Sequence, residues 1–253
     1  YWWNYNYYNV PKGMPIIASR VEGDQFGKQS GDGVWWATIS TFWSWWLELI
    51  RNQERNIREK MVIFWHQFFP TGANAVYCCT YTSCEYWQNA LLRYRAMGNF
   101  KTLLREVSTT TPMLFHLNGN ENTKHTPNQN YGRELQEVYA LGKLVYMQIP
   151  NNSYTEQDVV EISRILTGWR CHPENGISVA ARSYFVPNLH DTGDKKLSAY
   201  YGNVVIKGKT GAAGATELDE LLNIMATKND MSINVATKVY RFFVLKFLVW
   251  FAF

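Results

Sequence analysis

The stretch that decides the fold is LNGNENTKHTPNQNYGRELQEVYALG (residues 117–142), followed after a short loop by YTEQDVVEISRILTGW (residues 154–169). Each segment opens with residue types that cap a helix and closes at a glycine, which is how a helix boundary is written in a sequence. Between these limits, apolar residues recur at helical spacing. The two segments therefore predict two sharply bounded helices in a mainly α-helical protein.

The first helix is expected to begin at a capping box. Thr126 stands as the N-cap, Pro127 occupies the first helical position, and Gln129 follows three residues after the cap. Proline is tolerated there because its missing N–H has no intrahelical partner in any case. Gly142 is expected to end the helix as its C′ residue.

The same helix carries a dense polar stripe, because Asn130, Arg133, Glu134 and Glu137 follow the spacing i, i+3, i+4, i+7. The opposite face is apolar, with Leu135, Val138 and Tyr139. The stripe contains an internal Arg–Glu ion pair. It is either a solvated face that braces the neighbouring Asn118–Asn122 turn, or the wall of a site.

The second helix has a second capping box, with Thr155 as the N-cap and Asp158 at N3. Tyr154 and Val159 are placed to form a hydrophobic staple across this start. Gly168 is expected to end the helix.

Helical periodicity also covers Thr41–Phe69, a segment starting at the N-cap Asn99, a short segment from Thr111, and two helices from Thr216 and about Ser232. Two apolar faces are expected in the first of these, made by Trp43, Trp46, Leu47 and Ile50, and by Ile57, Met61, Phe64, Trp65 and Phe68.

From Arg170 to Thr216 the helical period disappears, and Gly, Pro and Asn punctuate the chain. Short strands are expected at Ser183–Val186 and Asn203–Ile206, and pairing between them would make a small β-ribbon. The predicted organisation is an aromatic-rich N-terminal segment of poorly determined structure (1–40), then one helical domain (41–253) with an irregular insertion at 170–215.

The 253 residues carry a net charge of +4 with scattered basic side chains, which argues against a nucleic-acid-binding surface. Aromatic residues are abundant at 16% and gather at both ends of the chain. The closing apolar run is interrupted by Lys246 and is shorter than the roughly 20 residues of a transmembrane helix. Because the chain begins without Met and stops on an apolar segment, we expect a fragment of a longer protein.

Five residues are candidates for catalysis: His66, Glu134, Glu137, His190 and Asp191. For His66, a partly buried, hydrogen-bonded histidine is the favoured interpretation over a ligand or a base. His190 and Asp191 lie in a loop, where catalytic residues often occur, but Asp-Thr-Gly is also ordinary turn chemistry. For the Glu134–Glu137 stripe, a polar bracing network and acid–base catalysis remain alternatives.

The Asn-rich turn and its surroundings supply the candidate ligand-binding residues. Asn118, Asn120 and Asn122 could offer oxygen atoms, although structural use of an Asn-Gly turn is favoured and the acidic pattern of a calcium loop is missing. The sequence Gly208-Lys209-Thr210 lacks the glycine spacing of a phosphate loop. The four cysteines have no zinc-binding spacing, and we predict neither a metal nor a cofactor. The remaining candidates are Asn130, Arg133 and Trp169.

The chain resembles the bacterial family known as domain of unknown function 1800 (DUF1800). The matching segments occur in the family's order from Trp45 to Val244: WWLELI, REKMVIFWHQFF, LLRYRAMGNFKTLLREVS, MLFHLNGNEN, PNQNYGREL, YTEQDVVEISRILTGW, HDTGDKK, ELDELL and TKVYRFFV. The resemblance implies a largely helical protein that is made with an export signal, and it implies no established activity.

The chain departs from the family pattern at several positions. Phe68 stands where the family commonly has a second histidine, which weakens a two-histidine metal site. Around the Arg–Glu pair, Gly132, Gln136 and Tyr139 are also unusual.

The expected function is that of an exported helical scaffold, or a binding and assembly component, of the bacterial cell envelope. Its location would be the periplasm, the outer-membrane surface or the outside of the cell. Its partners would be other envelope or secreted proteins, with a glycan as a further possibility. The alternative is a hydrolase-like enzyme acting on an envelope polymer or glycan.

Overall fold

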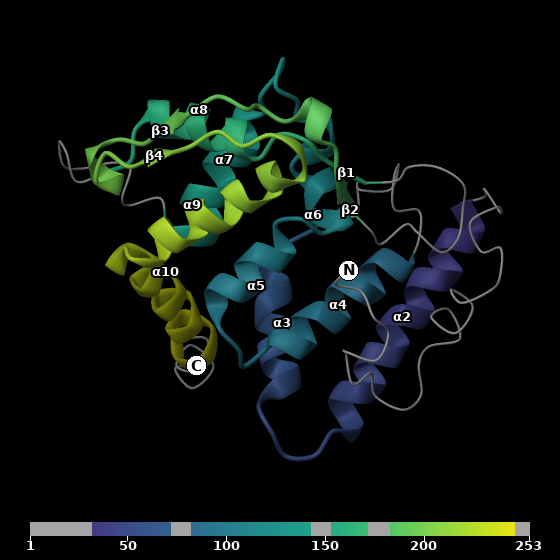
Figure 1. Cartoon of the computed structure of the whole chain (residues 1–253). Helices are drawn as coiled ribbons and strands as arrows, with labels where there is room; N and C mark the ends of the chain where they lie inside the picture. Colours follow the sequence, from purple (N-terminus) through teal and green to yellow (C-terminus); the bar gives the residue numbers. More distant parts are fainter. Residues whose placement is uncertain (1–31, 72–81, 143–152, 172–182, 246–253) are drawn as a thin grey trace. The chain divides into compact units, whose positions relative to one another are not determined.

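A computed structural model describes residues 32–71, 82–142, 153–171 and 183–245, and the chain divides into two compact units (Figure 1). Unit 1 comprises Tyr1–His116 and Cys171–Tyr184, and unit 2 comprises Leu117–Arg170 and Phe185–Phe253. Most of the expected N-terminal segment, Cys78, Cys79 and the closing apolar run lie outside the described residues. The predicted fold class is confirmed: within the described ranges the chain is mainly α-helical, with two small two-stranded sheets.

Unit 1 is built from helices whose aromatic side chains form its core. The helices are α2 (Asp32–Asn52), α3 (Arg58–Phe68), α4 (Thr82–Arg95), α5 (Phe100–Val107) and α6 (Thr111–His116). Helix α5 begins at the predicted N-cap, because the Asn99 side chain accepts a hydrogen bond from the Thr102 N–H. The buried side chains of α3 are packed edge to face or stacked against one another: Phe64, Trp65 and Phe68, with Phe69 after the helix end.

The inward face of α2 is not the one that spacing alone predicts. Trp43 and Leu47 are 47% and 65% exposed, whereas Phe42, Trp45 and Trp46 are buried. Aromatic residues occur nearly all round this helix, so apolar periodicity cannot select a face. The buried face is also held by polar contacts, because the Trp46 indole donates to the buried carboxylate of Glu59 (3.1 Å) and the Arg93 guanidinium lies 5.5 Å from the centre of the Trp45 ring. The predicted face of α3 is wrong in one position, since Ile57 lies before the helix and is 47% exposed.

Unit 2 contains α7 (Gln129–Glu134), a π-helical continuation (Leu135–Ala140), α8 (Glu156–Ile165), α9 (Glu217–Ala226) and α10 (Asn229–Tyr240). A second π-helical turn, Arg241–Leu245, follows α10. The helix predicted from Thr216 is confirmed as α9, and four of its apolar residues are buried: Leu218, Leu221, Leu222 and Met225. Gly142 has a φ of 93° after the π-helical segment, as predicted for its end.

The predicted start of α7 is wrong by two residues. Asn128, rather than Thr126, is the N-cap, and its side-chain oxygen accepts from the Tyr131 N–H (3.3 Å). Thr126 instead pairs with Thr123 across an isolated β-bridge. Asn128 is the better cap here because its amide also donates to the Leu117 carbonyl (2.7 Å), which fixes the side chain before the helix begins.

The capping box of α8 is confirmed. The Thr155 side chain accepts from the Asp158 N–H, and the Asp158 carboxylate accepts from the Thr155 N–H (2.7 Å). Tyr154 and Val159, the predicted staple, are both buried. The second oxygen of Asp158 accepts from the Ser198 N–H (2.7 Å), so this cap also attaches the long irregular segment to α8.

Helices α7 and α8 approach closely at Gly132. A Cβ built there would lie 2.4 Å from the Ser163 Oγ and 2.7 Å from the Val159 carbonyl oxygen. The unusual Gln136 is also explained, because its amide donates to the Gly132 carbonyl (3.0 Å) and its oxygen accepts from the Tyr201 hydroxyl (2.7 Å). Gly132 therefore sets the distance between the two helices, and Gln136 ties them to the irregular segment.

The irregular segment holds strands at the predicted places but with different partners. Strand β2 (Ser183–Phe185) pairs with β1 (Trp169–Cys171), and β4 (Val205–Ile206) pairs with β3 (Lys195–Lys196). The predicted pairing of β2 with β4 is therefore wrong. Strands β3 and β4 lie side by side (Figure 1), and in this antiparallel pair Lys195 lies opposite Ile206. Strands this short have little pattern of their own, so tertiary contacts decide their pairing.

Candidate functional site

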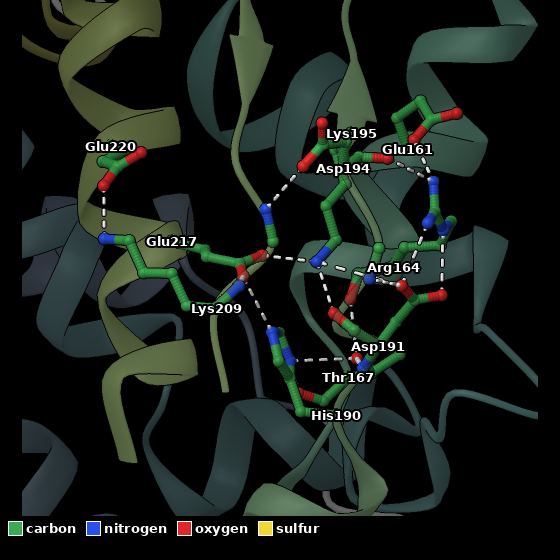
Figure 2. A network of polar contacts seen from close by, with 12 residues as sticks. Glu161, Arg164, Thr167, His190, Asp191, Asp194, Lys195, Lys209, Glu217 and Glu220 are labelled. Atoms are coloured by element: carbon green, nitrogen blue, oxygen red, sulfur yellow. Dashed lines mark hydrogen bonds and ion pairs between the residues drawn. The ribbon is translucent and has the colours of Figure 1, made fainter. Parts of the chain in front are cut away.

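His190 and Asp191 lie at the centre of a network of charged side chains in unit 2, which Figure 2 shows from close by. They directly follow a single 3-10 turn, Pro187–Leu189, and opposite them lie Arg164 of α8 and Thr167 of the turn that ends this helix. We call six residues of this network the clasp: Glu161, Arg164, His190, Asp191, Lys195 and Glu217.

The imidazole of His190 is enclosed by protein, with only 1% of the residue exposed. Its Nδ1 lies 3.1 Å from the Thr167 hydroxyl and 3.0 Å from the Thr167 carbonyl oxygen. Its Nε2 lies 3.2 Å from Oε1 of Glu217. The Phe185 ring packs at 5.1 Å between centroids. Both ring nitrogens therefore face groups of the protein itself, although Nε2 makes no hydrogen bond.

Asp191 is held by a bidentate ion pair with Arg164. The guanidinium Nε and Nη2 each lie 2.9 Å from a carboxylate oxygen of Asp191, and Nη1 lies 2.5 Å from Glu161. Burial alone would raise the pKa of Asp191, but the hydrogen bonds from Arg164 and from the Gly193 N–H outweigh it and lower the pKa. The Asp191 carboxylate is thus ionised and committed to Arg164.

Lys195 and Glu217 form the interior of the clasp. Both side chains are fully buried, and Nζ lies 2.6 Å from Oε2. The ammonium group also donates to the Asp191 carbonyl, and the Lys209 N–H donates to the Glu217 Oε1 (2.7 Å). Burial would raise the pKa of Glu217, yet its close contacts with His190 and Lys195 lower it overall. Figure 2 shows these groups converging on the Glu217 carboxylate.

Two further ion pairs lie around the clasp and account for the lysines of the glycine-rich loop. Lys207 pairs with Asp194 (2.7 Å), and Lys209 pairs with Glu220. The Lys209 ammonium also donates to the Thr216 hydroxyl (2.6 Å). Lys209, in the segment that partly matches a phosphate loop, therefore stabilises the start of α9.

Two glycines allow the loops to close around His190. A Cβ at Gly214 would lie 2.6 Å from the His190 ring, and a Cβ at Gly208 would lie 1.9 Å from the Thr192 carbonyl oxygen. Real Cβ atoms do not approach so closely, so these positions require glycine. The glycine spacing of this segment is a packing requirement of the clasp.

The contacts of the Asn-rich turn are structural, because they join it to other parts of unit 2. The Asn122 side chain is fully buried, donates to the Ser163 carbonyl (3.1 Å) and accepts from the Asn128 N–H (2.8 Å). The Asn122 carbonyl accepts from Arg170 (3.0 Å). Asn118 adopts the left-handed conformation with a φ of 53°, and Asn120 is half-buried. The turn thus joins α7 to the end of α8.

The polar stripe of α7 is directed to the start of α8 instead of to this turn. Arg133 makes a bidentate ion pair with Glu156 (2.9 and 2.6 Å) and the predicted i,i+4 pair with Glu137 (3.5 Å). The predicted bracing of the Asn118–Asn122 turn falls to Asn128 and Arg170. Asn130 is exposed and Glu134 is half-buried.

Trp169 lies in β1 and is half-buried. Its ring meets the edge of Phe185 at 5.4 Å between centroids. Phe185 in turn packs on the His190 ring, so Trp169 belongs to the apolar wall behind the clasp.

His66 belongs to unit 1, where it has the partly buried, hydrogen-bonded environment that was predicted. Its Nε2 lies 3.0 Å from the Asn89 amide, and its ring packs on Trp46 at 4.5 Å. Burial lowers the pKa of His66 to about 3, and the positive charge of Arg93 adds to this effect. Near neutral pH the imidazole is therefore uncharged.

The structure brings His190 and Asp191 together with residues that sequence reasoning missed. Arg164, Lys195 and Glu217 come from α8, β3 and the start of α9. Lys195 stands in the short basic run Lys195-Lys196, a pattern that is normally solvated, yet it is fully buried. The available signals were the Asp-Thr-Gly-Asp loop before Lys195 and the acidic residue directly before the apolar face of α9.

Comparison with known proteins identifies the family. The sequence profile described as "Protein of unknown function (DUF1800)" matches residues 24–246, which is most of the chain. The chain belongs to the DUF1800 family. No curated protein and no solved structure matches it. In this DUF1800 member, identified ion pairs hold the clasp together, and identified capping hydrogen bonds begin α7 and α8.

The described ranges of this DUF1800 chain hold neither a cluster of side chains suited to a metal ion nor a helix that could cross a membrane. Within those ranges, no group of three or more His, Cys, Asp or Glu side chains is arranged to hold a metal ion. Among the helices of the described ranges, none is both long and apolar enough to span a membrane.

Proposed function

We propose that this DUF1800 protein is an exported, non-catalytic scaffold of the bacterial envelope that binds other proteins. The observation that carries the proposal is the environment of His190. The residue is 1% exposed, and both ring nitrogens face groups of the protein itself. A general base needs a nitrogen within hydrogen-bond reach of its substrate. His190 offers none.

Three of the other four candidate catalytic residues, all except the half-buried Glu134, also contact groups of the protein. Asp191 is paired with Arg164, Glu137 lies beside Arg133, and His66 is bonded to Asn89. Carboxylates in such ion pairs have low proton affinity, which suits structure better than acid–base catalysis near neutral pH. These contacts favour a rigid helical scaffold over a hydrolase.

Export and the envelope location rest on what the family resemblance implies. A protein in that compartment whose His190 and Asp191 are already occupied by the clasp would act by binding envelope or secreted proteins, and a glycan is a second class of partner. The two rigid elements available for this purpose in unit 2 are the α7–α8 pair and α9, because the clasp and the cap at Thr155 fix them.

The experiment compares location, assembly and turnover of the full-length protein. A tagged wild-type protein is expressed in its own bacterium, fractionated, and sized under native conditions, and the purified protein is incubated with peptidoglycan sacculi and soluble glycans. We expect it in the envelope fraction, in a complex larger than the single chain, with no more polymer release than the His190→Gln variant.

The matched variants are Lys195→Met, which breaks the buried ion pair, and Arg133→Ala, which breaks an exposed one. Assembly should be lost with Lys195→Met in proportion to unfolding and kept with Arg133→Ala. Polymer hydrolysis by the wild type that His190→Gln abolishes at unchanged thermal stability would instead establish the hydrolase.

A further inference from the structure

Helix α7 does not end as a regular α-helix but continues into a π-helical turn, Leu135–Ala140. There the Gln136 carbonyl accepts from the Leu141 N–H (2.7 Å), five residues later, and from the Gly142 N–H (3.2 Å). The local sequence does not demand this wider turn, because LQEVYAL contains neither Gly nor Pro and includes good α-helix formers such as Leu, Gln, Glu and Ala. Since π-helical turns are rare, a contact from elsewhere in the fold must favour this one.

Helix α10 supplies that contact. The Asn234 amide donates to the Ala140 carbonyl (2.9 Å), and the Lys238 ammonium donates to the Val138 carbonyl (2.5 Å). Asn234 and Lys238 are four residues apart, so they project from the same face of α10. The last carbonyls of a helix have no partner within the helix. Two side chains of α10 therefore satisfy carbonyls at the end of the π-helical turn.

The start of this turn is fixed independently of α10. The Gln136 amide donates to the Gly132 carbonyl, and its oxygen accepts from the Tyr201 hydroxyl. A return to the α-helical register would therefore change only residues 137–142. Because an α-helix turns by about 100° per residue, removing the extra residue from the wide turn would rotate the following carbonyls away from α10.

Helix α10 is held to unit 2 by few apolar contacts. Among its twelve residues, all of which the structure describes, Met231 alone is buried. Ile233 and Tyr240 are 60% and 52% exposed. The start of the helix has an attachment of its own, because the Tyr200 hydroxyl donates to Asp230 (2.8 Å). Elements with little buried apolar surface open at low cost, so the rest of α10 is expected to open before the remainder of unit 2.

We propose that α10 is a conformational device: Asn234 and Lys238 hold the end of α7 in its π-helical form, and detachment of α10 returns residues 137–142 to the α-helical register. Only hydrogen bonds are exchanged in this step. The coupling is reciprocal, because whatever shifts one of the two elements shifts the other by the same free energy. A protein that binds α10 in its detached state thus favours the rewound end of α7. The device does not depend on the proposed scaffold function.

The test is NMR of the intact, deuterated chain labelled with 15N and 13C. Scalar couplings across hydrogen bonds identify the carbonyl that each N–H contacts. In the wild type we expect the Leu141 N–H to couple to the Gln136 carbonyl. In Asn234→Ala/Lys238→Met it should couple to the Glu137 carbonyl, as in an α-helix. A coupling to Gln136 that persists in this double variant would overturn the proposal.

Amide hydrogen exchange provides a second measurement with a matched control. The amides of Leu141 and Gly142 should exchange at least about tenfold faster in the double variant than in the wild type, because the hydrogen bonds that hold this turn are lost. The Leu166 amide, which is bonded within α8, should exchange at the wild-type rate. The control Ser232→Ala changes an exposed side chain of α10 and should leave all these rates unchanged. Equal acceleration at Leu166, or in the control, would indicate general destabilisation and contradict the proposal.

The single variant Asn234→Ala keeps the proposal testable if the double variant does not fold. It removes the hydrogen bond to the Ala140 carbonyl and leaves Lys238 in place. Exchange at Gly142 should again be faster than in the wild type, with Leu166 unchanged. An unchanged rate at Gly142 would show that α10 does not hold the π-helical turn.

Discussion

Lys195 Nζ lies 2.6 Å from Oε2 of Glu217, in an ion pair whose two side chains are both fully buried. Burying two charges is costly, and their attraction offsets that cost only when the remaining hydrogen-bonding groups are satisfied. Here Glu217 also accepts from the Lys209 N–H, and Lys195 also donates to the Asp191 carbonyl. The pair fixes the irregular segment to the first turn of α9.

Removing one member of this pair should strongly destabilise unit 2. We expect Lys195→Met to lower the free energy of unfolding by about 3–5 kcal/mol, because Glu217 is left as an unpaired buried charge. The measurement is urea unfolding followed by circular dichroism. The double variant Lys195→Met/Glu217→Leu should recover much of the loss. A double variant as unstable as the sum of both single variants would show that the pair does not act as a unit.

The ion pair between Arg133 and Glu156 provides the contrast. Its side chains are 33% and 56% exposed, and exposed pairs contribute little because water and salt screen them. Arg133→Ala should lower the free energy of unfolding by about 1 kcal/mol or less. If Arg133→Ala and Lys195→Met lowered the free energy of unfolding equally in the same urea experiment, burial would not determine how much these ion pairs contribute to stability.

The cap of α8 gives a local prediction. Thr155→Ala removes the side chain that accepts from the Asp158 N–H, so the free energy of unfolding should decrease by about 1 kcal/mol. Thr210→Ala is the matched control, because Thr210 precedes a 3-10 helix without a side-chain cap bond and is exposed. Chemical unfolding of both variants should show a lowered midpoint for Thr155→Ala only. Equal midpoints would place the start of α8 elsewhere.

Gly132 should not tolerate substitution by alanine. A helical alanine normally stabilises by up to about 1 kcal/mol relative to glycine, but here its Cβ would lie 2.7 Å from the Val159 carbonyl oxygen. Overpacking of this kind costs about 1–3 kcal/mol, so we expect a net loss of stability. Thermal unfolding of Gly132→Ala, alone and combined with Ser163→Ala, measures it. A raised melting temperature would contradict the close α7–α8 packing.

The neutral imidazole of His66 should make unit 1 sensitive to acid. Its folded pKa of about 3 lies below the ordinary value of 6.5, so its contribution to stability is complete above pH 6.5 and is lost as the pH falls toward 3. The carboxyls of Asp191 and Glu217, whose pKa values are lowered, add their losses below about pH 4. Between pH 7 and pH 5, the free energy of unfolding of His66→Gln should not show the decrease with falling pH that the wild type shows. An equal decrease in both proteins would assign this pH dependence to other groups.

The sequence predicts well those features that depend on neighbours in the chain. The capping box at Thr155 and Asp158 is an exchange of hydrogen bonds within four residues, so its pattern is sufficient. The start of α7 looked equally clear at Thr126, but the Asn128 amide donates hydrogen bonds to the carbonyls of Leu117 and Asn118. These tertiary contacts, ten and eleven residues away in the chain, select Asn128 as the N-cap.

The clasp could be predicted only in part, because its members are distant in the sequence. His190 and Asp191 were identified from their loop, whereas Arg164 lies 27 residues before Asp191 and Glu217 lies 22 residues after Lys195. A lysine in a short basic run is normally solvated, so Lys195 gave no sign of its burial. The strand pairing failed for the same reason, since two-residue strands have no periodicity to read.

The central claim is that His190 is a buried structural member of the clasp and not a catalytic base. It is tested most directly by hydrogen–deuterium exchange at the imidazole C2 position, measured by mass spectrometry on the native protein at neutral pH. His125, which is exposed, provides the reference in the same sample. Our account predicts exchange at His190 at least about tenfold slower than at His125, because stable buried elements exchange only through opening. Exchange at His190 as fast as at His125 would contradict it.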